Sequence, residues 1–594
     1  MRNILVLTIF AALISCGEST MDTDQISYPN SRVVDQIDTF WGTEVHDPYR
    51  WLEDDRAPEV EKWVEDQNEV TREYLDAIPF RAELSERYEE LFNYEKVGMP
   101  RVIGGRYFIS KNNGLQNQSV VYVRESLYGE EKVYLDPNTL SENGTVTANL
   151  GSASKDGQYV VVVRNEAGSD WQQLRVLDVA TGEEVGDVLD WVKFSGASWL
   201  GNGFFYSRYP APDGSEFSTE NTFHSVYYHR VGTDQSEDRL VFKNENEPNR
   251  YHFVGVSEDE KFLILNTSTG TDGNSIHVKK ADSDTSWLEV VGGFEHRSRV
   301  VGVIDGTIYL LTDIDAPKYR LVAIDSSNEL SDVSKWVDVI PHSENLLESA
   351  SITGGAIFAQ FLKNACNQVV RFELDGSSSA EITLPGSVGT TGGFGGKFEA
   401  KELFYSFTSF THPTSVYRLD LVSSKSELFA EPKVDFNKDD FETKQVWYDS
   451  KDGTKVPMFI IHKKGIELDG SNPTLLYAYG GFNINLTPGF SASNIVFLER
   501  GGVYAMPNLR GGGEFGEEWH EAGMLLKKQN VFDDFISAGE YLISEGYTSS
   551  SKLGIEGRSN GGLLIGAVMT QRPDLAAVAF PGVGVMDMLR YHKF

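Results

Sequence analysis

The residues best suited to chemistry are Gly-Arg-Ser-Asn-Gly at positions 557–561. They fit the pattern G-x-S-x-G, in which a serine lies on a sharp turn between a strand and a helix and exposes its hydroxyl. A serine hydroxyl is a weak nucleophile, so it needs a nearby base and donors that stabilise the oxyanion formed on attack. The pattern predicts Ser559 as a nucleophile and the backbone N–H of Asn560 as an oxyanion donor. Alone, it is short enough to occur by chance in a Gly/Ser-rich turn.

The flanking sequence predicts the elements that position this turn. In chain order they are strands at 474–478 and 502–507, a helix at 531–545, a strand at 553–556 and a helix at 562–570. Apolar residues at helical spacing define the first helix, with Asn530 as its N-cap and Gly546 as its stop. This alternation of strands and helices predicts a parallel α/β sheet.

A second glycine-rich stretch, residues 511–516, matches G-x-G-x-x-G, with Asp533 about 20 residues later. Glu514 falls where a pyrophosphate would lie, and no helical period starts directly after the loop. An anion would therefore meet a negative charge without a compensating helix N-terminus. We expect a solvated or interdomain loop, and no cofactor.

Several motifs in the right order resemble the prolyl oligopeptidase family. They are Asp-Pro-Tyr-Arg-Trp-Leu-Glu-Asp at 47–54, Tyr-Gly-Gly-Phe-Asn at 479–483, Asn-Leu-Arg-Gly-Gly-Gly-Glu-Phe-Gly at 508–516, Gln-Asn-Val-Phe-Asp-Asp at 529–534 and Gly-Arg-Ser-Asn-Gly-Gly at 557–562. The resemblance runs from about Tyr28 to the last residue. It implies a monomeric serine endopeptidase that hydrolyses short proline-containing peptides on the carboxyl side of proline through an acyl-enzyme.

The resemblance also implies roles for particular residues. The Tyr479 hydroxyl and the Asn560 amide would form the oxyanion hole, and Phe482 and Val585 would wall the proline pocket, with Asn560 also contacting substrate. A pyrrolidine ring has no donor to satisfy and gains most from flat apolar walls. From the residues alone, ordinary core packing would be the preferred interpretation of Phe482 and Val585.

One departure from the family concerns the catalytic base. Enzymes with this serine turn follow the chain order Ser, Asp or Glu, His, and the family places its catalytic aspartate and histidine, a pocket tryptophan and a substrate-binding arginine beyond the position of Phe594. The candidates already present are Asp574, Asp587, His592 and, before the serine, His520. None is expected to act as the base, and His520 is expected to be a surface or interdomain residue. The chain as printed is expected to be an inactive fragment of an enzyme.

Two other functions remain open at this stage. One is a related oligopeptidase that cuts after basic residues or releases dipeptides. The other is a lipoprotein in which the β-rich region only binds peptides. An incomplete parallel sheet with an exposed edge strand argues against the second alternative.

The N-terminus resembles a bacterial export signal. Arg2 precedes an apolar run at 4–14, which is shorter than the roughly 20 residues of a membrane span, and Leu-Ile-Ser-Cys at 13–16 resembles a lipobox. We expect a lipidated Cys16 and an exported protein of the bacterial cell envelope, lipid-anchored or, with a plain secretory signal, periplasmic. Cys366 is then left without a partner for a disulfide.

Charge and composition exclude other classes. The formal net charge is -35 and the pI is about 4.7, which argues against nucleic-acid binding and against strongly acidic peptide partners. The acidic residues are scattered, as on a well-solvated surface, and no residues have zinc or EF-hand spacing. We expect no bound metal, and membrane contact only through the lipid.

The region between residues 94 and 434 has a different texture, with short β-rich runs and frequent turns. A hydrophobic-turn-hydrophobic unit recurs about every 45 to 57 residues, a spacing that suits four-stranded propeller blades. The seven units are at 102–109, 154–161 and 257–264 and around Asn202, Gly306, Gly355 and Lys401. They predict a seven-bladed β-propeller, with a β-sandwich as the alternative; the resemblance implies the same propeller, covering the active site.

The predicted fold class is therefore α/β plus all-β: an α/β-hydrolase catalytic domain, incomplete at its C-terminus, with an inserted seven-bladed β-propeller. The predicted domains are a signal peptide at 1–16, an N-terminal arm at 17–94 with helices at 60–76 and 82–92, the propeller at 95–434 and the hydrolase domain at 435–594. The resemblance implies that the arm packs on the hydrolase domain.

Overall fold

The computed structural model describes residues 26–593 except 187, 214–219, 272 and 284. The predicted signal peptide at 1–16 and the lipidation of Cys16 lie outside the described residues and stay predictions. Among the helices that are described, none is both long and apolar enough to cross a bilayer. The chain divides into two compact units, residues 1–87 and 88–594, which are described separately.

The first unit holds a small hairpin and a long helix. Its elements are β1 (Ile37–Phe40), β2 (Thr43–His46) and α1 (Pro58–Asp76), followed by the start of α2 (Arg81–Phe92). Pro58 occupies the first turn of α1, where a helix needs no N–H donor and where the fixed φ of proline suits the backbone. The two helices predicted at 60–76 and 82–92 are confirmed.

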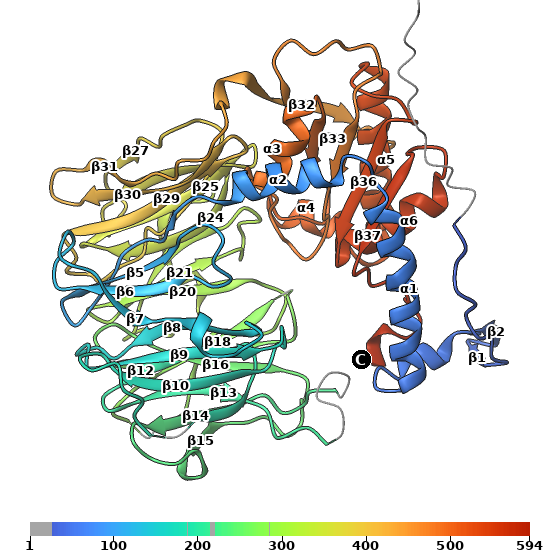
Figure 1. Cartoon of the computed structure of the whole chain (residues 1–594). Coiled ribbons are helices and arrows are strands. Elements are labelled where there is room, and N and C mark those ends of the chain that lie inside the picture. Colours follow the sequence, from blue (N-terminus) through green and yellow to red (C-terminus); the bar gives the residue numbers. More distant parts are fainter. Residues whose placement is uncertain (1–25, 187, 214–219, 272, 284, 594) are drawn as a thin grey trace, which may run out of the picture. The chain divides into compact units, whose positions relative to one another are not determined.

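After the end of α2, the second unit forms seven blades of β-sheet, of which the second and third are paired into one eight-stranded sheet (Figure 1). The first three are β3–β7 (Lys96–Val97, Arg101–Ile103, Arg106–Asn112, Val120–Arg124, Lys132–Leu135), β8–β11 (Val146–Ala153, Tyr159–Glu166, Gln172–Asp178, Leu189–Val192) and β12–β15 (Ser198–Leu200, Gly203–Arg208, Ser225–Arg230, Arg239–Phe242). The next two are β16–β19 (Tyr251–Val256, Phe262–Ser268, Asn274–Lys280, Leu288–Val291) and β20–β23 (Ser298–Ile304, Thr307–Thr312, Arg320–Asp325, Val337–Ile340). The last two are β24–β27 (Leu346–Thr353, Ala356–Lys363, Cys366–Phe372, Ser379–Ile382) and β28–β31 (Thr390–Gly392, Glu402–Ser409, His412–Asp420, Lys425–Ala430).

Each of the seven predicted hairpins lies within a different blade, which confirms the propeller. Glycine occupies two of these turns at a point where neighbouring blades touch. Gly104 and Gly157, at the hairpin turns of the first and second blades, have φ of 56° and 73° and touch through their backbones: a Cβ on Gly157 would lie 2.4 Å from the Gly104 nitrogen. The two blades can pack this closely only because both residues lack a side chain.

The first and last blades meet without sharing a strand. Every strand of the first blade comes from the start of the propeller, and every strand of the last blade comes from its end. Side chains join them: the Tyr107 hydroxyl donates to Glu402 Oε1 at 3.0 Å, and Leu127 packs with Phe404 and Val416 in one apolar cluster. No backbone hydrogen bond links the two blades among the described residues.

The hydrolase domain is a six-stranded sheet with helices on it. Its strands pair in the order β32-β33-β35-β34-β36-β37, and the last four run parallel. The strands are β32 (Phe441–Asp449), β33 (Lys455–Lys463), β34 (Thr474–Tyr477), β35 (Val503–Pro507), β36 (Leu553–Arg558) and β37 (Val578–Gly582). The helices are α3 (Ala492–Glu499), α4 (Glu517–Glu521), α5 (Gln529–Ser544) and α6 (Asn560–Gln571).

Two details of this domain differ from the sequence prediction. The three predicted strands, β34, β35 and β36, pair parallel as expected. The sheet also contains β32 and β33, which were not predicted: they form an antiparallel hairpin, and β33 pairs antiparallel with β35. Asn530 is not an N-cap: α5 begins at Gln529, and the Asn530 side chain donates to the Ala522 carbonyl at 2.8 Å. The Asn530 side chain therefore binds the loop that precedes α5 and does not cap the helix.

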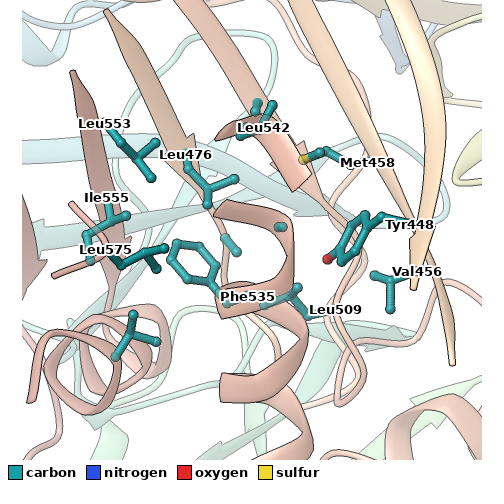
Figure 2. Close-up of a cluster of buried hydrophobic side chains, with 14 of the residues drawn as sticks. Tyr448, Val456, Met458, Leu476, Leu509, Phe535, Leu542, Leu553, Ile555 and Leu575 are labelled. Carbon is teal, nitrogen blue, oxygen red and sulfur yellow. The ribbon is translucent and has the colours of Figure 1, made fainter. Parts of the chain in front are cut away.

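Helix α5 packs its apolar face on the sheet. Figure 2 shows Phe535 of α5 among Leu476 of β34 and Ile555 of β36, and all three side chains are at most 2% exposed. Full burial of one such side chain stabilises a fold by about 1.5 to 3 kcal/mol. This packing holds β36, and the turn that follows it, in a fixed place.

A buried ion pair also holds α5 against the loop that follows β35. Asp534 of α5 accepts from the Arg510 backbone N–H at 3.1 Å and from Arg510 Nη2 at 2.6 Å, and Ser450 Oγ donates to it at 2.5 Å. The side chains of Arg510 and Asp534 are 5% and 0% exposed. Because each charge is compensated by the other, the pair ties the loop after β35 to the helix.

Candidate active site

Ser559 lies on a strained turn between β36 and α6. Its φ is 56° and its ψ is -116°, in a region that side chains other than glycine rarely adopt. The Ser559 N–H donates to the Gly582 carbonyl at 3.0 Å, and its own carbonyl accepts from the Leu563 N–H at 3.1 Å. The residue is exposed. This strand-turn-helix geometry is the context that the G-x-S-x-G pattern requires for a nucleophile.

The glycines around Ser559 are required by close backbone contacts. A Cβ on Gly557 would lie 2.3 Å from the Gly561 carbonyl oxygen, and one on Gly561 would lie 2.7 Å from that of Ala478. A Cβ on Gly562 would lie 2.4 Å from the Gly582 carbonyl oxygen. Contacts below 3 Å would force the backbone apart, so the turn needs all three glycines.

The structure brings Tyr479 and Asn560 together. Strands β34 and β36 are parallel neighbours with Tyr477 paired to Glu556, so Tyr479 and Ser559 both follow strands at the same edge of the sheet. The Asn560 side chain donates from Nδ2 to the Tyr479 carbonyl at 2.7 Å. Asn560 is also the first residue of α6, where backbone N–H groups have no acceptor within the helix. Such an N–H is available to an anion, and the helix dipole favours negative charge there.

The two predicted proline-pocket residues are both exposed. Phe482 follows Tyr479 in a tight turn with φ of 55° and is 54% exposed, and Val585 follows β37 and is 41% exposed. Because both side chains are exposed, neither residue is packed in a core, which was the alternative interpretation. Their role as walls of a pocket stays a prediction.

The loop after β35 is buried, not solvated. Glu514 is 2% exposed, and its Oε1 accepts from the Leu486 N–H at 2.8 Å and from Asn508 Nδ2 at 3.1 Å. His520, which we expected at a surface or between domains, is 3% exposed, and its Nδ1 lies 2.8 Å from the Gly511 carbonyl oxygen. The loop is therefore not solvated, and His520 is not at the surface. The interdomain alternative is confirmed for the loop, because a Cβ on Gly516 would lie 2.5 Å from the Pro317 carbonyl oxygen of the propeller, to which the Glu517 N–H donates at 2.8 Å.

The burial of Glu514 makes the stability of the domain depend on pH. Burial raises the pKa of the Glu514 carboxyl from 4.5 to about 7. Between these values the folded chain holds a proton that the unfolded chain has released. The contribution of Glu514 to stability therefore falls as the pH rises through this range.

We expect Glu514→Gln to raise the free energy of unfolding at pH 8 by on the order of 2 kcal/mol and to change it little at pH 4, because the amide keeps the Oε1 acceptor and carries no charge. The measurement is the chemical denaturation midpoint of the hydrolase domain at both pH values. Glu518→Gln, at an exposed position of α4, is the matched control and should shift neither. An identical pH dependence in wild type and Glu514→Gln would contradict the prediction.

Comparison with known proteins identifies the family. The model of the "Prolyl oligopeptidase, N-terminal beta-propeller domain" matches residues 28–432, and that of the "Prolyl oligopeptidase family" matches residues 488–594. The chain is 45% identical over 586 residues to the prolyl endopeptidase of Elizabethkingia meningoseptica, an alignment that covers 98% of this chain and 82% of the relative. The chain belongs to the prolyl oligopeptidase family. The resemblance inferred from the motifs is confirmed.

More distant members of the prolyl oligopeptidase family also match this chain in sequence and fold. The prolyl endopeptidase of Dictyostelium discoideum is 34% identical over 650 residues, covering 96% of this chain and 84% of that one. A solved structure from a study of two prolyl endopeptidases is 38% identical with a TM-score of 0.92, and prolyl oligopeptidase B of Galerina marginata, bound to a 25mer macrocyclization substrate, is 31% identical with a TM-score of 0.90. Each covers 96% of this chain, and this chain covers 84% of each. The fold of this family, an N-terminal β-propeller and a C-terminal α/β-hydrolase domain, is confirmed.

One residue beside the candidate site of this prolyl oligopeptidase family member, Lys528, was not predicted from the sequence. Lys528, which directly precedes α5, donates from Nζ to the Gly480 carbonyl and to Asn560 Oδ1. Its partners lie 48 and 32 residues away in sequence, so no local pattern could reveal the contact. His592 lies in a short 3-10 helix, Tyr591–Lys593, and is exposed.

Proposed function

We propose that this protein is a serine endopeptidase that hydrolyses short peptides on the carboxyl side of proline through an acyl-enzyme on Ser559. One observation carries the proposal: Ser559 has the strained backbone of a nucleophile turn, at the start of a helix, in a chain that is 45% identical to a prolyl endopeptidase. The substrate class follows that relative and the motif around Phe482.

The proposed reaction starts with attack of Ser559 Oγ on the carbonyl carbon of the substrate's proline. A base takes the hydroxyl proton, and the carbonyl oxygen becomes an oxyanion, to which the Asn560 N–H and the Tyr479 hydroxyl donate. Collapse breaks the peptide bond, and the base returns the proton to the leaving amine. Water then repeats the sequence on the acyl-enzyme and releases the carboxylate.

Specificity for proline is proposed to come from Phe482 and Val585. Their exposed apolar side chains suit a ring that brings no hydrogen-bond donor. A pocket for arginine would need a carboxylate to pair with the guanidinium, and the residues proposed for this pocket carry none.

The lipid anchor on Cys16 and a monomeric state remain predictions.

The test combines labelling with a substrate series, on the protein expressed from its complete gene. A fluorophosphonate probe should attach at Ser559, found by mass spectrometry of the labelled peptide, and Ser559→Ala protein should take up none. Among fluorogenic peptides that differ only at the cleavage position, proline should give the highest kcat/KM over alanine and arginine. Faster cleavage after arginine would replace the proline assignment with the basic-specific alternative, and no label at Ser559 would support the non-catalytic one.

A further inference from the structure

Lys528 joins two parts of the proposed oxyanion site. Its Nζ donates to the Gly480 carbonyl at 3.0 Å and to Asn560 Oδ1 at 2.9 Å. Both acceptors are neutral, and burial lowers the pKa of the lysine amine to about 8. A lysine held in this environment loses hydration, which its hydrogen bonds must offset.

These bonds complete a network with the Tyr479 loop. The Tyr479 carbonyl accepts from Asn560 Nδ2 at 2.7 Å, and the next carbonyl, that of Gly480, accepts from Lys528. Lys528 in turn holds the oxygen of the same Asn560 amide. Three segments, the loop after β34, the start of α6 and the residue before α5, are therefore linked in a closed set of three hydrogen bonds.

The same region is packed too tightly to shift without breaking contacts. A Cβ on Gly481 would lie 2.5 Å from Asn560 Nδ2, and a Cβ on Gly480 would lie 2.4 Å from Val531 Cγ1 of α5. The loop that carries Tyr479 therefore lies directly on Asn560 and on α5. Within this packing, the three hydrogen bonds set the position of the loop relative to the start of α6.

We propose that Lys528 is a positioning residue of the oxyanion site: it holds the Tyr479 loop and Asn560 in one register, so that the tyrosine hydroxyl and the Asn560 N–H converge on the same oxygen. The inference rests on the proposed function, because it assumes that these two groups bind the oxyanion. Lys528 itself contacts neither substrate nor Ser559 in this role. Donors that must meet a small charge tolerate little displacement, so a residue that fixes both contributes to turnover.

The test replaces the lysine in the protein expressed from its complete gene. Lys528→Met keeps the length of the side chain and removes both hydrogen bonds, and kcat should fall about 10- to 100-fold while KM stays nearly unchanged. Lys527→Met is the matched control, since Lys527 is the adjacent, exposed lysine, and its kcat should equal that of wild type. The glutamine of Lys528→Gln is smaller and keeps a hydrogen-bond donor, so the kcat of this variant should lie between those of Lys528→Met and wild type. If Lys528→Met does not fold, the kcat of Lys528→Gln decides the question.

A second measurement separates positioning from a general loss of structure. A peptide ending in proline aldehyde forms a hemiacetal with the nucleophile, whose oxygen occupies the oxyanion site. Its affinity should fall in Lys528→Met by the same factor as kcat, whereas that of the product peptide, which ends in proline carboxylate, should not. In a Tyr479→Phe background the effect of Lys528→Met should shrink, because the hydroxyl that the lysine positions is gone.

The outcomes distinguish this inference from the proposed function. A labelled and active wild-type enzyme together with unchanged kcat in both Lys528 variants would overturn the role of Lys528 alone. Equal losses for the aldehyde and the product peptide, or a rise in KM at constant kcat, would also overturn it. Absence of label at Ser559 in wild type would instead overturn the proposed function.

Discussion

Replacing Tyr479 with phenylalanine is expected to lower kcat about 10²- to 10³-fold and to leave KM nearly unchanged, as loss of one oxyanion donor does. The hydroxyl acts on charge that exists only in the transition state, so its removal does not weaken binding of the substrate itself. The phenyl ring keeps the packing of the loop. Steady-state kinetics on a proline-containing fluorogenic peptide, with the protein from its complete gene, measure both constants.

The matched control for this experiment is Tyr477→Phe. Tyr477 is the last residue of β34, two positions before Tyr479, and its side chain is half-buried. It has no assigned part in the reaction, so kcat should match that of wild type. An unchanged kcat in Tyr479→Phe would remove Tyr479 from the mechanism and leave the Asn560 N–H as the assigned donor.

Replacing Asp534 with asparagine is expected to destabilise the hydrolase domain by about 3 to 5 kcal/mol, because it leaves the charge of a buried partner uncompensated. Arg510 would keep Asp452, whose side chain is 48% exposed, but would lose the fully buried carboxylate that holds its guanidinium and its backbone N–H. The midpoint of chemical denaturation and the hydrogen exchange of α5 amides measure the effect.

The adjacent residue provides a control for the Asp534 prediction. Asp533 pairs with Lys451, whose side chain is 74% exposed, at 3.3 Å. A pair of this kind contributes up to about 1 kcal/mol, so Asp533→Asn should shift the midpoint far less. Equal shifts for the two variants would show that the buried pair contributes no more than a surface one.

The sequence predicted the elements that are defined locally. The glycines at 557, 561 and 562 and the apolar runs on either side were enough to place a strand, a turn and a helix around Ser559. The propeller followed from repetition, because each blade has its own hairpin with its own turn residues. Hydrophobic period and turn chemistry act over a few residues, so a single sequence displays them.

The parts that could not be predicted depend on contacts between distant residues. The loop with Glu514 was expected to be solvated or to lie between domains. Its burial depends on distant partners, because the Leu486 N–H and the Asn508 side chain donate to Glu514 in the interior. The antiparallel start of the sheet and the contacts of Lys528 belong to the same class. Tertiary packing overrides local preference in each case.

At the junction between the first and last blades, neither the covalent chain nor a shared strand closes the propeller ring. Successive blades are joined by the covalent chain, and the second and third also by a strand pair, but this junction relies on Tyr107, Glu402 and a small apolar cluster. Parting it would sever no peptide bond and, among the described residues, no sheet hydrogen bond. Separating the first and last blades would therefore open the ring at one place and leave every individual sheet intact.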